Sequence, residues 1–197
     1  MKKQHTEHIL GAKLKQRSRF LSYLESPVRA AYIPYFGEGD IAHALYSDYR
    51  IYGADVNEDF LITARRRLPE ATLLNADIEA EYPFAYIETP ITLADFDAYA
   101  EPYTALKHFL EKAVLDTELV LFGTQSCMVM RQRRYYEPSQ GENLPLSRPM
   151  TVSSYYVKVV KPYLTALLEH HNYQVRRLKR FQKGRMLYWA LHAEADD

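Results

Sequence analysis

Five short apolar runs alternate with helical segments between residues 29 and 125. The apolar runs are Ala30 to Pro34, Arg50 to Asp55, Ala71 to Asn75, Ile91 to Asp97 and Glu118 to Gly123, and the helical segments are Asp40 to Tyr46, Glu58 to Leu68 and Tyr103 to Ala113. Strands that alternate with helices are typical of βαβ units, in which helices cover both faces of a parallel sheet. The sequence therefore predicts an α/β, doubly wound fold.

The regions on either side of this alternation complete the expected fold. Residues 5–25 have the apolar spacing of an amphipathic helix, with Arg17 on its apolar face. A second helix is expected from Ser153 toward His171, kinked or split by Pro162. Two closing runs, at 173–181 and 186–192, indicate an antiparallel hairpin. Together these elements predict a mostly parallel seven-stranded sheet with helices on both faces and a C-terminal antiparallel hairpin.

Composition favours one ordinary globular domain. The 197 residues are 47% hydrophobic and 25% charged, and no apolar run approaches the roughly 18 residues of a membrane span. The first residues lack the apolar core of a signal peptide, and a lone cysteine, Cys127, excludes an internal disulfide and a cysteine-rich zinc site. We therefore expect a cytoplasmic protein with no membrane contact and no metal.

Three acidic residues, Asp55, Asp77 and Asp97, end successive predicted strands. The carboxyl ends of strands in a doubly wound sheet lie along one edge, where ligands bind. Asp55 could accept hydrogen bonds from ribose hydroxyls, and Asp77 could accept one from an adenine amino group. Upstream, Gly37 and Gly39 allow a tight turn and a close approach of the backbone to a ligand. The order of these residues predicts a nucleotide pocket.

Three of these segments resemble the class I S-adenosylmethionine (SAM) methyltransferases. The run from Ile33 to Gly39 is similar to their SAM-binding loop, Tyr52 to Asn57 to their ribose motif and Leu74 to Ile78 to their adenine motif. The resemblance implies the following cofactor-binding residues: Phe36, Gly37, Gly39, Asp55, Val56, Asp77 and Ile78. It also implies a single methyltransferase-like domain over 1–197, divided into an N-terminal helix (1–26), a SAM-binding core (29–125), an insertion or lid (126–150) and a last helix with a hairpin (151–197).

The fourth motif points to a substrate class. Asp95 to Tyr103 is similar to the Asp-x-Asp-Pro-aromatic-Gly-x-Pro pattern of tRNA guanine-N2 methyltransferases, with Ala98 and Ala100 in place of proline and glycine. The style of the loop and this motif together imply an enzyme that methylates an exocyclic amine of a nucleic-acid base. Asp97 would accept from the amine, and Tyr99 or Tyr103 would stack on the base; packing against the adjacent helix is the alternative for both tyrosines.

A basic segment follows the fifth predicted strand. Arg131, Arg133 and Arg134 precede Tyr135 and Tyr136 in a stretch of about 25 residues without periodic pattern. Arginine pairs with phosphate and tyrosine stacks on bases, so this segment is a candidate nucleic-acid contact. The formal net charge is zero, which weighs against a strongly basic binding protein.

Two other functions remain open. Gly37 to Ala42 matches the G-x-G-x-x-A dinucleotide fingerprint, with Asp55 as its ribose acid, which is typical of nicotinamide-dependent oxidoreductases. The methyltransferases usually carry an acid where this chain has Ile33 or Pro34, and Glu38 or Asp40 would have to substitute for it. A non-catalytic module that keeps the methyltransferase fold for binding nucleic acid or protein is therefore the second alternative.

Overall fold

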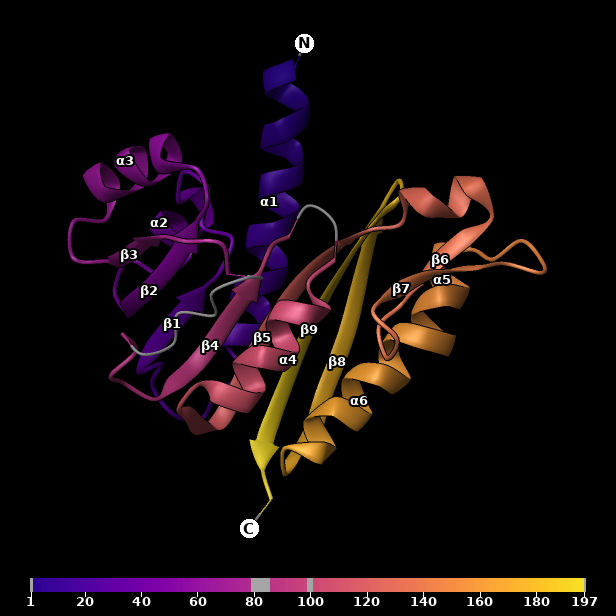
Figure 1. Ribbon diagram of the computed structural model, residues 1–197. Helices are drawn as coiled ribbons and strands as arrows, with labels where there is room; N and C mark the ends of the chain where they lie inside the picture. Colours follow the sequence, from indigo (N-terminus) through magenta and orange to yellow (C-terminus); the bar gives the residue numbers. More distant parts are fainter. Residues whose placement is uncertain (1, 79–85, 99–100, 197) are drawn as a thin grey trace.

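A seven-stranded sheet forms the centre of the protein (Figure 1). The computed structural model describes residues 2–78, 86–98 and 101–196, with side chains from residue 10 onward except those of 129 and 131. The strands lie in the order β3-β2-β1-β4-β5-β9-β8, and their bounds are β1 (Ala30–Ile33), β2 (Arg50–Asp55), β3 (Thr72–Asn75), β4 (Ile91–Phe96), β5 (Leu115–Ser126), β8 (Tyr173–Lys183) and β9 (Met186–Ala195). Only β9 runs against its neighbours β5 and β8, which confirms the predicted mostly parallel sheet with a closing hairpin.

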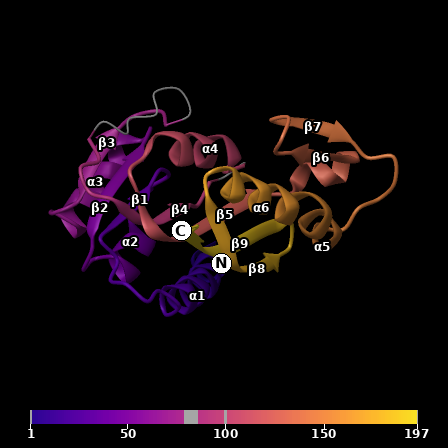
Figure 2. The ribbon, with the colours of Figure 1, turned by 90° about the horizontal axis from the view of Figure 1, so that it is seen from below.

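Helices cover both faces of this sheet (Figure 2). One face packs against α1 (Lys2–Leu21), α2 (Asp40–Leu45) and α3 (Glu58–Arg67), and the other packs against α4 (Tyr103–Lys112) and α6 (Lys161–His170). Each face has its own apolar cluster, with Phe20 and Leu61 in the first and Phe109 and Leu164 in the second. Strands buried on both faces explain why the sequence carries continuous apolar runs there.

A buried ion pair holds α1 on the sheet. Arg17, in the apolar stripe of the predicted helix, donates through Nε and Nη2 to the carboxylate of Asp95 in β4, at 2.5 and 2.6 Å. Both side chains are 1% exposed, and Tyr46 after α2 donates its hydroxyl to the same carboxylate at 2.9 Å. A charge buried this deeply is tolerated because it is paired and hydrogen-bonded. The helix ends at Leu21, earlier than the predicted residue 25.

The segment 126–150, which shows no periodicity in the sequence, has regular structure. It contains the 3-10 helix η1 (Met128–Gln132) and an antiparallel ribbon of β6 (Arg134–Glu137) and β7 (Glu142–Pro145). The ribbon rests on α5 (Val152–Tyr155), because the Tyr155 hydroxyl donates to the Tyr136 carbonyl at 2.7 Å. A π-helical turn, η2 (Tyr156–Val160), joins α5 to α6 next to Pro162, which agrees with the predicted split.

Candidate functional site

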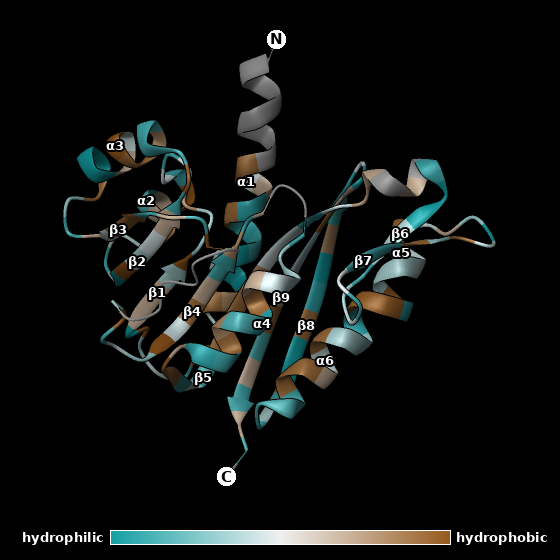
Figure 3. Ribbon diagram, viewed as in Figure 1, coloured by the Kyte–Doolittle hydropathy of each residue, from teal (hydrophilic) through white to brown (hydrophobic). Residues whose placement is uncertain are grey.

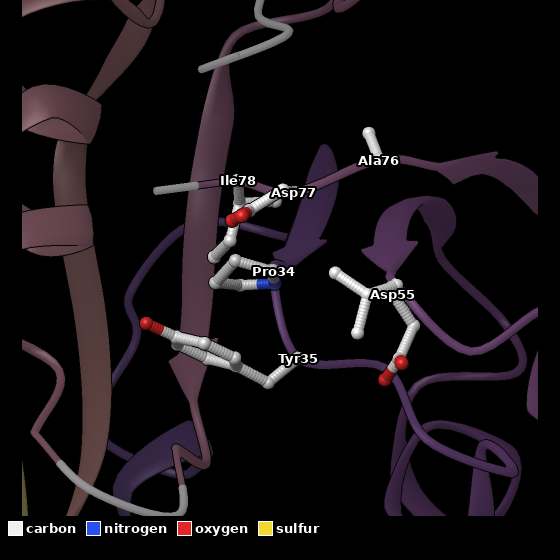
Figure 4. A pocket seen from close by; sticks show the side chains of 7 residues that line it. Pro34, Tyr35, Asp55, Ala76, Asp77 and Ile78 are labelled. Carbon is white, nitrogen blue, oxygen red and sulfur yellow. The ribbon is translucent and has the colours of Figure 1, made fainter. Parts of the chain in front are cut away.

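A pocket of about 260 Å³ lies where β1, β2 and β3 end (Figure 4). Its walls are formed by Pro34, Tyr35, Asp55, Val56, Ala76, Asp77 and Ile78. The volume lies just below the roughly 300–1,000 Å³ of ordinary ligand sites. The predicted residues Asp55, Val56, Asp77 and Ile78 therefore come together at one site, at the sheet edge where ligands of doubly wound folds bind.

Asp55 is held in place by backbone amides from two loops. The amide of Gly37, after β1, donates to one carboxylate oxygen at 2.8 Å, and the amide of Asn57, after β2, donates to the other at 2.9 Å. Each carboxylate oxygen can accept a second hydrogen bond. The carboxylate is thus oriented by the protein while it keeps capacity for hydroxyl donors in the pocket.

The glycine turn shapes this arrangement. Gly37 and Gly39 have φ angles of 56° and 76°, the left-handed region that glycine adopts without steric cost. A Cβ on Gly39 would also lie 2.9 Å from the ring of Phe36. That ring is 5% exposed and belongs to the core cluster under α2 and α3. The prediction that Phe36 binds the cofactor is therefore corrected: Phe36 supports the turn from inside the core.

Three wall residues were not predicted: Pro34, Tyr35 and Ala76. Phe36 and Tyr35 are both aromatic neighbours of Gly37, and the sequence gives no sign of which one turns inward. Alternation along β1 does not predict the outcome, because it would place Tyr35 with Ala31 and Ile33 on the α1 side, whereas Phe36 lies on that side and Tyr35 packs on the α4 side. Figure 4 shows the ring of Tyr35 beside Pro34 at the pocket.

The acid that the resemblance expects near the turn has no substitute in this pocket. Ile33 packs in the core and Pro34 is a wall residue. Glu38 and Asp40 are exposed, do not line the pocket, and Asp40 pairs instead with Arg67 of α3. The pocket acids among the described residues are therefore Asp55 and Asp77.

Asp97 follows β4 and faces α1. Its carboxylate accepts two hydrogen bonds from Nζ of Lys13, at 2.8 and 2.6 Å, and one from the hydroxyl of Thr124 in β5. Burial works to raise the pKa of Asp97, but Arg17 and Lys13 outweigh it, so the pKa lies below its usual range. Asp97 is thus a charged, firmly held carboxylate with 17% of its side chain exposed, and it does not line the pocket.

Tyr103 lies in the core at the start of α4. The residue is 1% exposed, and its ring stacks on that of Tyr136 with 5.9 Å between the ring centroids. Its hydroxyl donates to Oε1 of Gln125 at 2.6 Å. This placement agrees with the packing alternative, and no ring face remains open for a base. Burial raises the pKa of Tyr103 well above its usual value. Tyr99 lies outside the described residues.

The predicted nucleic-acid contacts lie in the insertion. Arg133, with a φ of 55°, and Arg134 are exposed, and Arg134 donates to the carbonyl of Asn143 across the β6-β7 ribbon at 2.6 Å. The side chain of Arg131 lies outside the described ones. The 3-10 helix that contains Arg131 begins beside the closing hairpin, because the amide of Cys127 donates to the Arg185 carbonyl at 2.7 Å.

One group of potential metal ligands occurs among the described residues: Glu118, His192 and Glu194. Glu118 already accepts from the amides of Glu25 and Ser26 and contacts Nε2 of His192 at 2.8 Å. Glu194 pairs with Arg176 at 2.6 Å. These contacts give the group a structural role, since they tie the end of the α1 region to β5 and β9.

None of the helices within the described ranges is long and apolar enough to cross a membrane.

Comparisons with known proteins identify the fold through solved structures alone. No protein-family model and no curated protein matches the sequence. Solved structures do match: TrmN from Thermus thermophilus (15% identity, TM-score 0.53, 90% of this chain), an rRNA methylase from Streptococcus thermophilus (16%, 0.57, 91%) and the N-methyltransferase NodS from Bradyrhizobium japonicum in complex with S-adenosyl-L-homocysteine (14%, 0.59, 92%). The matches cover 47%, 94% and 85% of those chains, so this chain spans about half the length of TrmN. The chain has the fold of the class I SAM-dependent methyltransferases.

Proposed function

We propose that this protein is a SAM-dependent methyltransferase that acts on an exocyclic amine of a nucleic-acid base. The observation that carries the proposal is the Asp55 carboxylate, oriented by the Gly37 and Asn57 amides at the mouth of a pocket between β1, β2 and β3. Two hydroxyls of a ribose fit such a bifunctional acceptor. Asp77 adds an acceptor for the adenine amino group, and Val56 and Ile78 add apolar surface for the ring.

The positive end of the cofactor needs a different partner here. SAM supplies a methyl group on a positively charged sulfur. Tyr35 is the aromatic wall residue of the pocket, and aromatic faces attract cations within about 6 Å of the ring centroid. The methionine ammonium of SAM is a second cation, and it is the group that the acid of related loops helps to bind. We assign Tyr35 to this cationic methionine end of the cofactor, in place of that acid.

The acceptor side rests on residues after β4. Methyl transfer is an in-line displacement, so the protein must hold the amine near the methyl group and accept its hydrogen bonds. Asp97 offers a fixed carboxylate for this, and the charges of Arg17 and Lys13 lower its pKa and so favour the ionised form. Tyr99 stays a predicted stacking residue, and Arg131, Arg133 and Arg134 stay predicted contacts to the nucleic-acid backbone. The rRNA methylase among the structural neighbours supports nucleic acid as the substrate class.

Calorimetry and thermal unfolding with S-adenosylhomocysteine test the cofactor. At about 100 times its dissociation constant the ligand should stabilise the protein by about 2.7 kcal/mol. Asp55→Ala should abolish this stabilisation, whereas Asp48→Ala, an exposed acid before β2, should retain it. Stabilisation by NAD(H) instead would refute the methyltransferase in favour of the oxidoreductase, and a folded protein that binds neither ligand would favour the non-catalytic module.

Transfer of a labelled methyl group tests the substrate class. RNA, DNA and protein fractions are incubated separately with the protein and labelled SAM. We expect label in RNA or DNA, and Asp97→Ala should lower turnover with little effect on S-adenosylhomocysteine binding. Label in the protein fraction alone would refute the nucleic-acid substrate while it left the cofactor assignment intact.

A further inference from the structure

The edge strand β8 is unusually basic. Five of its 11 residues are Lys or Arg and none is acidic: Arg176, Arg177, Lys179, Arg180 and Lys183. Figure 3 shows β8 as a largely hydrophilic strand, and it lies at the edge of the sheet beside β9. One known role of charges on an edge strand is to prevent another strand from pairing with it. The arrangement of these charges relative to α1 argues for more than that.

Three of the cations share the α1 face of the sheet. Arg177 pairs with His192 across the ladder and Lys179 pairs with Ala190, whose side chain belongs to the α1-side core. Directly paired residues point to the same face of a sheet, and so do alternate residues of one strand. Lys183 therefore lies on this face too. Along the strand, Arg177 and Lys179 are about 6.6 Å apart, and Lys179 and Lys183 are about 13 Å apart.

A fourth cation reaches the same place from α1. The guanidinium carbon of Arg177 lies 4.3 Å from the ring centroid of Tyr23, and Nε of Arg19 donates to the Tyr23 hydroxyl at 3.0 Å. Two arginines that are far apart in the sequence thus meet on one tyrosine. Both side chains are exposed, and within the described part of the chain neither has a carboxylate partner.

Several other exposed arginines, in contrast, are paired with carboxylates. Arg65 and Arg67 on α3 pair with Glu58 and Asp40, and Arg176 at the start of β8 pairs with Glu194. Like charges that converge without a counter-charge repel one another, and a bound anion relieves that repulsion. The surface therefore has the chemistry of a polyanion site.

We propose that Arg19, Arg177, Lys179 and Lys183, the α1–β8 basic surface, bind the phosphodiester backbone of a nucleic acid. Arginine and lysine are the usual phosphate ligands, and Tyr23 gives the arginines an aromatic support. Lys183 lies at the end of the sheet that carries the pocket. Its ladder partner Met186 also pairs with Ser126, the last residue of β5, and the pocket lies at the carboxyl ends of the parallel strands. As a substrate-docking surface the assignment rests on the proposed function; as a nucleic-acid-binding surface it can be tested alone.

Fluorescence anisotropy with labelled oligonucleotides of mixed sequence tests the surface. Single-stranded RNA, single-stranded DNA of the same sequence and an RNA duplex are titrated with the full chain at several salt concentrations. The double variant Arg177→Ala/Lys179→Ala should bind roughly tenfold more weakly and lower the slope of log affinity against log salt by about 1.4, which corresponds to two lost single-strand phosphate contacts. The matched control is Arg66→Ala/Lys161→Ala, which removes two exposed cations from α3 and α6.

Several results decide the matter. Equal losses for RNA and DNA support recognition of the backbone, and a larger loss for RNA supports an RNA substrate. Equal behaviour of the double variant and its control would overturn the proposal, as would polyglutamate that displaces RNA at equal charge concentration. S-adenosylhomocysteine binding is measured on the same variants. Loss of RNA binding in a protein that never binds this ligand would keep the surface and reject the methyltransferase.

Discussion

Replacement of Arg17 by methionine should destabilise the protein far more than replacement of Arg19, two residues later on the same helix. Arg17 and Asp95 form a pair that is 1% exposed on both sides, with hydrogen bonds of 2.5 and 2.6 Å. Among the described residues, Arg17→Met leaves the buried Asp95 carboxylate with the Tyr46 hydroxyl as its one remaining side-chain partner. Breaking a buried pair from one side costs about 3–5 kcal/mol.

The assay is equilibrium unfolding in urea together with thermal unfolding. For a chain of this size the expected loss lowers Tm by roughly 6–20 °C. Arg19→Met, at an exposed position, should change the free energy of unfolding by about 0.5 kcal/mol or less. The double variant Arg17→Met/Asp95→Leu should recover part of the loss, because no charge is then left buried. If Arg17→Met and Arg19→Met had equal stabilities, the buried pair would not hold α1 on the sheet.

Three further outcomes follow from the core and its charged contacts. Gly53→Ala should cost about 1–3 kcal/mol in urea unfolding, because its Cβ would lie 2.2 Å from the Phe36 ring, whereas Gly11→Ala in open space should stabilise α1 by about 0.5–1 kcal/mol. The stability that Asp97 contributes is present above its unfolded pKa of 3.8 and is lost as the pH falls through its lower folded pKa, so Asp97→Asn and the parent should converge in acid during pH-dependent melting. Burial raises the pKa of the Cys127 thiol to about 12, although Arg185 opposes the shift, so iodoacetamide should modify Cys127 slowly until urea is added; rapid labelling of the folded protein would contradict this placement.

Much of the fold could be predicted because its signals are local. Each strand of the parallel part appears as an apolar run, and Asn57 before α3 is an N-cap that accepts from the Asp59 amide at 3.0 Å. The order of Asp55 and Asp77 at strand ends places both at one pocket, since parallel strands share a carboxyl edge. These inferences need only the period of the pattern and the topology that it implies.

The parts that could not be predicted depend on contacts between distant segments. Phe36 and Tyr35 are neighbours of similar character, and only the space left by Gly39 and Gly53 decides that Phe36 enters the core. Tyr103 is buried because Tyr136, in the insertion, covers its ring. The insertion itself is held by the Tyr155 hydroxyl, a contact that no periodicity encodes.

The two ion pairs that hold α1 on the sheet join residues that are far apart in the sequence, which has a consequence for folding during synthesis. Lys13 finds its partner Asp97 only 84 residues later, and Arg17 waits 78 residues for Asp95. Tyr23 meets Arg177 only when β8 has been made. Until β4 has been made, burial of Lys13 and Arg17 against the sheet would leave both cations without their carboxylate partners, which is unfavourable. We therefore expect α1 to dock on the sheet only after β4 has been made, and its contact with β8 to form later still.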